Sequence, residues 1–144
     1  MANSKLMLGM YRLLVIGLTI LITGCSHKSI SLGLQDTLMQ YERAVRWSDF
    51  ILAAEYLNVS DPGKAQAYAA MEGVKVTDYQ VRTASEDQSG RSYSQLVEIQ
   101  FYREPSIYQQ KIMDRQQWEY HTEKRRWVLT SGLPAFQPAG ATHP

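Results

Sequence analysis

The sequence predicts an α+β domain in which N-terminal helices pack on a curved antiparallel meander of four strands. The main observation is a change in the spacing of apolar residues. They recur every three or four positions in the first part of the chain and every second position from Val74 onwards. A meander with one apolar face needs a cover, and the preceding helices can supply it.

The first 24 residues are predicted to be an export signal. Leu13 to Thr23 is an apolar run about half as long as the roughly 20 residues that a helix needs to cross a bilayer. Lys5 and Arg12 precede it without any acidic residue, and its apolar residues cover every face of a helix, unlike an amphipathic core helix. A basic stretch followed by a short apolar run is typical of a secretory signal.

The single cysteine follows this run. "LITGC", Leu21 to Cys25, resembles the lipobox of bacterial lipoproteins, in which an aliphatic residue, a small residue and glycine precede the cysteine. The resemblance implies a diacylglycerol on the Cys25 sulfur, removal of residues 1–24, and an N-acyl chain on the new amino terminus. Three acyl chains exceed what stable anchoring needs. Ser26 stands where inner-membrane lipoproteins of enteric bacteria carry Asp, which implies the outer membrane of a Gram-negative cell.

The composition after removal of the signal excludes several classes of function. The remaining 120 of the 144 residues carry 13 basic and 14 acidic side chains, which gives nucleic acid no electrostatic attraction. With Cys25 acylated, no thiol is left for a disulfide. The histidines do not have metal-ligand spacing, and no nucleophile elbow or phosphate-binding glycine loop is present. We therefore expect no cofactor apart from the acyl chains on Cys25.

Residues 25–33 are predicted to be a lipidated tether and residues 34–136 the folded domain. The tether is short, polar and uncapped, and its last eight residues reach at most about 26–29 Å when extended. A first helix is predicted up to about Trp47, because its apolar residues step by four, three and four positions. These residues are Leu34, Leu38, Tyr41 and Val45.

Two further helices are predicted before the sheet. Ser48 and Asp49 indicate an N-cap, and the helix that follows has Ile51, Ala54 and Leu57 on one face. Residues 64–71 contain good helix formers and end before Gly73. At the other end of the chain, residues 137–144 are predicted to be a disordered tail.

Four strands are predicted, over about residues 74–84, 92–103, 107–121 and 126–131. In the third strand the odd positions are polar, so the even positions face inwards: Tyr108, Gln110, Ile112, Asp114, Gln116, Trp118 and Tyr120. Pairing Phe101 with Gln110 places Ile99 opposite Ile112 and Tyr93 opposite Trp118. The next hairpin places Tyr120 opposite Trp127 and Trp118 opposite Leu129. Both registers keep the apolar residues on one face, as a buried face requires.

The order of these elements resembles a known superfamily. A helical hairpin over residues 41–57, long strands, and a closing "QQWEYHTEKRRWVL" over residues 116–129 are similar to the nuclear transport factor 2-like superfamily of cystatin-like rolls. The resemblance implies a curved sheet with helices on its concave face. This fold carries enzymes, ligand binders and assembly modules, so it leaves the function open.

The inner face contains polar residues that need an explanation. The register places Asp114 opposite Val97 and Gln116 opposite Gln95, and a buried carboxylate is costly unless it is paired or hydrated. We favour a bulge that turns Asp114 outwards, or a sheet that projects beyond the helices. The alternative is a pocket in which polar side chains orient a ligand between aromatic walls. Its candidate residues are Asp114, Gln116, Gln95, Tyr93, Trp118 and Tyr120.

Three functions follow from these features. The favoured one is a membrane-anchored, periplasm-facing lipoprotein that acts without catalysis, as an accessory or interaction module of a cell-envelope complex with a protein partner. The second is a binder of a small or lipidic ligand in the concavity of the roll. The third is an enzyme that uses Asp114, for which the register brings no histidine or second carboxylate beside it.

Overall fold

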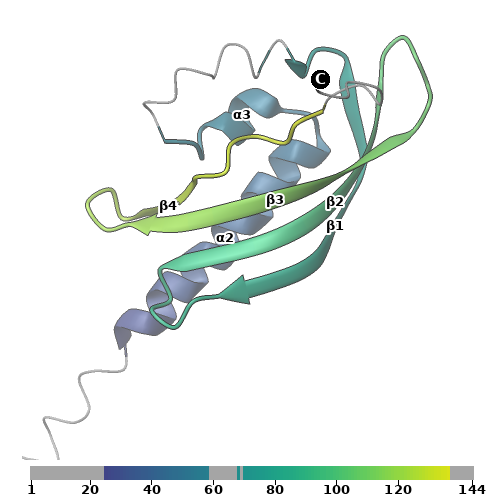
Figure 1. Cartoon of the computed structure of the whole chain (residues 1–144). Helices are drawn as coiled ribbons and strands as arrows, with labels where there is room; N and C mark the ends of the chain where they lie inside the picture. Colours follow the sequence, from purple (N-terminus) through teal and green to yellow (C-terminus); the bar gives the residue numbers. More distant parts are fainter. Residues whose placement is uncertain (1–24, 59–67, 69, 137–144) are drawn as a thin grey trace, which may run out of the picture.

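The computed structural model describes residues 25–58, 68 and 70–136. The predicted signal, most of the predicted third helix and the predicted tail lie outside these residues. Within them the order is two helices followed by four strands, which confirms the α+β class. In Figure 1 the strands curve around helix α2, which lies along one face of the sheet.

Helix α2 runs from Cys25 to Arg46 and is 22 residues long. It begins nine residues before the predicted start, so residues 25–33, which the sequence predicts to be a tether, are helical. This stretch contains no proline, and a helix already stabilised by packing can extend through it at little cost. Helical geometry shortens the last eight residues to about 12 Å. No helix in the described ranges is long and apolar enough to cross a membrane.

Helix α3, Phe50–Ala54, begins where the sequence predicts it. The Asp49 carboxylate caps it by accepting a hydrogen bond from the Leu52 backbone N–H at 3.0 Å. Ala54 and Leu57 are buried as predicted, but Ile51 is 73% exposed. Phe50 points inwards in its place, so the buried face is rotated by one residue.

The four strands form one antiparallel sheet in the order β1-β2-β3-β4. Their bounds are β1 Val74–Glu86, β2 Ser92–Arg103, β3 Gln110–His121 and β4 Arg126–Leu129. The predicted registers are confirmed. The pairs include Tyr93↔Trp118, Ile99↔Ile112, Phe101↔Gln110, Tyr120↔Trp127 and Trp118↔Leu129.

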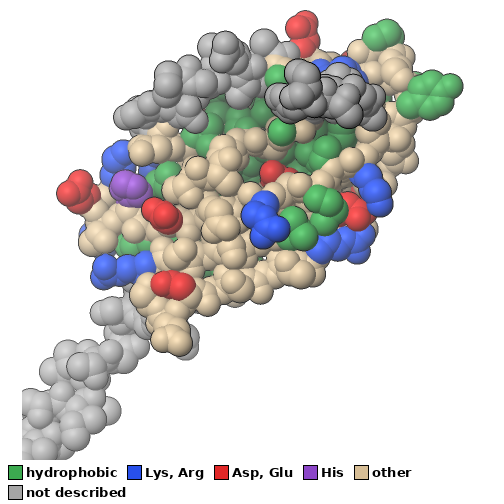
Figure 2. Space-filling view, viewed as in Figure 1, with side chains coloured by type: hydrophobic (Ala, Val, Ile, Leu, Met, Phe, Trp, Pro, Cys, Tyr) green, Lys and Arg blue, Asp and Glu red, His purple; other side chains and the backbone are tan. Residues whose placement is uncertain are grey.

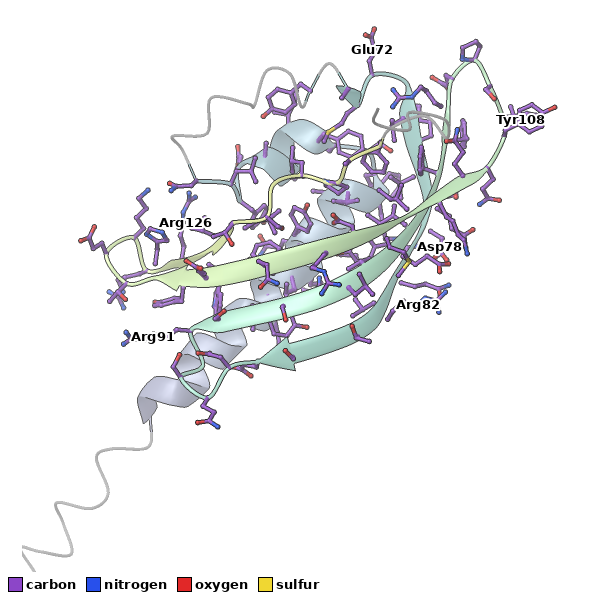
Figure 3. The ribbon with its side chains drawn as sticks, viewed as in Figure 1. Glu72, Asp78, Arg82, Arg91, Tyr108 and Arg126 are labelled. Carbon is purple, nitrogen blue, oxygen red and sulfur yellow. The ribbon has the colours of Figure 1, made fainter. Side chains whose placement is uncertain are left out.

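The connection between β2 and β3 is wider than predicted. β3 begins at Gln110 and not at residue 107, because Phe101↔Gln110 is the last pair of this hairpin and the chain between them forms a loop. Tyr108, predicted to point inwards, is 81% exposed and projects from this loop (Figure 3). The prediction for this residue is wrong because strand alternation does not extend into the loop.

The core lies between α2 and the inner face of the sheet. Tyr41 of α2 packs edge-on against Trp118 of β3, with ring centroids 5.1 Å apart, and Tyr56 contacts both rings. Phe136 fills the far end of the core, against Phe50 and Phe101. Of the four predicted helix positions, Leu34, Tyr41 and Val45 are buried and Leu38 is partly buried.

The opposite face of the sheet is polar. Glu98 of β2 forms an ion pair with Arg82 at 3.0 Å and a longer one with Lys111 at 4.0 Å. Figure 2 shows this face with charged side chains of both signs scattered over it.

We expect Trp127→Ala to lower the free energy of unfolding by about 3–5 kcal/mol, because Trp127 is buried beside Tyr120 and Leu129. Denaturant unfolding and the melting temperature measure this effect. Trp47→Ala is the matched control, since Trp47 is 81% exposed and its removal should change stability by less than about 0.5 kcal/mol. Equal losses in the two variants would contradict the placement of Trp127 in the core.

Candidate functional site

A layer of polar side chains interrupts the apolar inner face of the sheet. Asp114 pairs with Val97, and Gln116 pairs with Gln95, as predicted. The register between β2 and β3 is continuous through these positions, so the favoured bulge at Asp114 is wrong. The register shifts lie in β1, between Val76 and Asp78 and between Val81 and Thr83.

The polar layer is a chain of hydrogen bonds that ends on Asp114. The Tyr93 hydroxyl donates to Gln95 Oε1 at 3.3 Å, and Gln95 Nε2 donates to Gln116 Oε1 at 2.7 Å. Gln116 Nε2 donates to Asp114 Oδ2 at 2.8 Å. The hydroxyl of Tyr79 donates to Gln116 Oε1 at 3.2 Å. Both amides are thus held in a fixed orientation.

The surroundings of Asp114 disfavour the charged form of its carboxylate. Burial raises the pKa of Asp114 to about 6, and the hydrogen bond from Gln116 offsets this only in part. The ion pairs among the described residues join Arg46 to Glu42 and Glu98 to Arg82 and Lys111; none includes Asp114. Its negative charge is therefore stabilised by an amide and by no cation in this part of the chain.

The aromatic residues of the predicted pocket divide into two groups. Trp118 is fully buried against Tyr41, and Tyr120 packs on Trp127, so both belong to the core. The Tyr41 hydroxyl and Trp118 Nε1 are buried, and neither has a hydrogen-bond partner among the described residues. Burial, with the nearby Asp114 charge, raises the pKa of Tyr41 well above its usual value. Tyr93 remains partly exposed and reaches the surface.

A cleft of about 240 Å³ opens where α2 faces the β1 edge of the sheet, and we refer to it as the α2–β1 cleft. Its helix side consists of Gln35, Leu38, Met39 and Glu42. Its sheet side consists of Tyr79, Val81, Tyr93 and Gln95. Two of the six predicted pocket residues, Tyr93 and Gln95, thus line it, while Asp114 and Gln116 lie behind its floor. The sequence does not indicate Gln35 and Glu42, because their place in the cleft depends on how α2 packs against the sheet.

A second feature is the corner between α2 and α3. Trp47 is 81% and Ile51 73% exposed. A hollow of about 250 Å³ lies on one side of Trp47, lined by Met39, Glu42, Arg43, Arg46 and Trp47. A groove of about 690 Å³ lies on the other side, lined by Ser48, Asp49, Phe50, Ile51, Tyr68, Met71 and Glu72. We call the residues Met39, Arg43, Arg46, Trp47 and Ile51 the Trp47 corner.

The described residues offer little for catalysis. Among residues 25–58, 68 and 70–136, no group of three His, Cys, Asp or Glu side chains could hold a metal ion. Burial raises the pKa values of Tyr41 and Tyr79, and these are the described titratable groups whose pKa values the charge of Asp114 raises further. A general acid–base pair needs a partner that titrates near neutral pH, and these tyrosines do not.

Comparisons with known protein families, with curated proteins and with solved structures found no match. The interpretation of the site therefore rests on its geometry and chemistry.

We expect the contribution of Asp114 to stability to fall as pH rises from about 4 to about 6. The native Asp114 keeps its proton up to about pH 6, whereas the unfolded chain releases it near its ordinary value, so the unfolded state binds fewer protons between these values. Asp114→Asn keeps an acceptor for Gln116 and removes the charge. It should stabilise the protein by about 1–3 kcal/mol at pH 7.5 and change little at pH 4.

Urea unfolding at pH 4, 6 and 7.5 measures this effect. Asp36→Asn, a change at an exposed position of α2, is the matched control and should have the same small effect at each pH. A destabilisation by Asp114→Asn that is equal at pH 4 and pH 7.5 would contradict a desolvated carboxylate.

Proposed function

We propose that this chain is a lipoprotein of the cell envelope, anchored through Cys25 to the periplasmic leaflet of an outer membrane, and that its domain binds a protein partner without catalysis. We further infer that the domain is a roll of the nuclear transport factor 2-like type. The lipobox over residues 21–25 supports the anchor, and the helices that precede a curved antiparallel sheet support the roll.

The position of Cys25 supports a fixed arrangement on the membrane. Cys25 begins α2, and the first part of this helix projects from the domain (Figure 1). A helix of 22 residues is about 33 Å long, so the Trp47 corner lies about that far from the anchor. It would thus be directed away from the bilayer, where an envelope protein could reach it.

The exposure of Trp47 is the observation that carries the proposed interaction. Tryptophan, arginine and methionine are enriched at protein interfaces, and exposed apolar side chains between hollows are typical of binding surfaces. The Trp47 corner combines an exposed Trp47 and Ile51 with Arg43 and Arg46. We infer a partner with an apolar pocket that is edged by carboxylates, because these would match the two arginines.

The packing of the interior supports this function over an enzyme and over a binder of a lipidic ligand. The concave face of the sheet is filled by α2, whose Tyr41 is fully buried against Trp118. A binder of a lipidic ligand needs a larger enclosed cavity. An enzyme that uses Asp114 needs a second group that titrates near neutral pH, and the described neighbours of Asp114 do not provide one.

We expect Cys25→Ser to abolish the incorporation of radioactive palmitate in cells and to release the protein from the membrane. In the proposed modification the Cys25 thiolate accepts the diacylglyceryl group, and a serine hydroxyl does not replace it. Labelling and membrane fractionation measure the two effects. Label retained in the variant, or wild-type protein free in the periplasm, would overturn the anchoring.

We expect Trp47→Ala to remove a stoichiometric partner that copurifies with the chain from detergent-solubilised outer membranes. Truncation of an interface tryptophan typically costs at least about 2 kcal/mol, or roughly thirtyfold in affinity. Tyr108→Ala removes an equally exposed aromatic from the β2–β3 loop and should retain the partner. A photoreactive residue at Arg43 should crosslink to the same partner, and one at Arg115, on the polar face of the sheet, should not.

Partner loss in both the Trp47 and Tyr108 variants, or in neither, would contradict the assignment of the interface. The melting temperatures of both variants identify any loss that is due to unfolding.

A further inference from the structure

The α2–β1 cleft has a composition that points to a class of ligand. Its walls are apolar where Leu38, Met39 and Val81 line it, and aromatic where Tyr79 and Tyr93 line it. Glu42 at its rim is the only charged side chain of the described lining, and no Lys, Arg or His belongs to that lining. Aromatic faces together with a carboxylate attract organic cations.

A second carboxylate lies behind the floor of the cleft. Gln95 connects the cleft to Gln116, and Gln116 donates to Asp114. The charges of Asp114 and Glu42 both act on the Tyr79 hydroxyl and contribute to raising its pKa. The cleft is therefore a region of negative potential, and a cation bound there would reduce the cost of the buried Asp114 charge.

We propose that the α2–β1 cleft binds a small organic ammonium ion against Tyr93, the partly exposed aromatic of its lining, with Glu42 as its counter-ion. The volume of about 240 Å³ is that of roughly eight water-sized groups, which suits a cation of a few carbons. A phosphate-linked headgroup would bring a negative charge beside Glu42, so a free ammonium ion fits better. The cleft adjoins the Trp47 corner, with which it shares Met39, but the proposed ligand does not depend on the proposed partner.

Arg46 is the natural competitor for Glu42. Arg46 Nη1 lies 3.6 Å from Glu42 Oε1, and both side chains are well exposed, at 49% and 37%. An exposed ion pair of this spacing on a helix contributes only about 0.3–0.5 kcal/mol. Glu42 is thus able to exchange Arg46 for a ligand cation, and the removal of Arg46 should favour the ligand.

The test is a titration of the ¹⁵N-labelled full chain with n-butylammonium chloride at pH 7, followed by NMR, with 1-butanol as a neutral probe of similar size. We expect butylammonium to shift the signals of the Gln95 side-chain amide and of β1, and to bind at least tenfold more tightly than butanol. Phosphocholine should bind more weakly than butylammonium. Equal binding of butylammonium and butanol, or tighter binding of phosphocholine, would overturn the proposal.

Variants that remove one charge should change the affinity for butylammonium in opposite directions. Glu42→Gln should weaken butylammonium binding three- to tenfold, and Arg46→Gln should strengthen it two- to threefold. Glu119→Gln removes an exposed carboxylate from β3, outside the cleft, and should leave the affinity unchanged. An affinity that Glu42→Gln leaves unchanged, or that Glu119→Gln lowers as much as Glu42→Gln does, would also overturn the proposal.

The pH dependence gives an independent readout. Between pH 7 and pH 5 Asp114 gains a proton, and the affinity for the cation should fall several-fold. The other groups that face the site from α2 and the sheet are Glu42, Arg46 and the hydroxyls of Tyr41, Tyr79 and Tyr93. The tyrosines have raised pKa values and stay neutral in this range. In Asp114→Asn any remaining pH dependence of the affinity comes from Glu42. This variant should lose most of the fall in affinity between pH 7 and pH 5. An unchanged fall in affinity would contradict the coupling to Asp114.

Discussion

The edge contact between Tyr41 and Trp118 joins the helix to the sheet. Their ring centroids are 5.1 Å apart, both side chains are fully buried, and Tyr56 closes the cluster from the segment after α3. Trp118 pairs with Tyr93 on one side and with Leu129 on the other. Because strand side chains alternate, this one placement determines which residues of β2, β3 and β4 face inwards.

The same placement creates the polar layer. With Trp118 directed inwards, Gln116 and Asp114 must follow on the same face of β3, two and four residues away. The two buried glutamines bond to each other and to Tyr79, but no described residue gives Asp114 a cation or the Tyr41 hydroxyl a hydrogen-bond partner. Most of the structure agrees with simple packing rules. Sites that depart from such rules are often functional.

The sequence was sufficient for the register because apolar alternation permits only one pairing that keeps Ile99, Phe101 and Trp118 on one face. It was insufficient for β1, where a register shift between Val76 and Asp78 changes the inward positions from Val74 and Val76 to Tyr79 and Val81, and a second shift between Val81 and Thr83 changes them again. A simple period of two therefore does not hold along this strand. The sequence favours a bulge or a projecting sheet at Asp114 because a buried carboxylate is costly unless it is paired or hydrated, and the continuous register contradicts the bulge. A raised pKa and one amide hydrogen bond make that burial tolerable at a cost of about 3 kcal/mol.

The helical conformation of residues 25–33 has a consequence for orientation. Cys25 and the buried stripe that begins at Leu34 belong to one continuous helix, so they share a single helical phase. With acyl chains on Cys25, one residue inserted between them would rotate the anchor by about 100° around the helix axis, whereas seven would nearly restore its direction. The number of residues in this segment, rather than any contact, then sets which side of the domain turns towards the lipid headgroups.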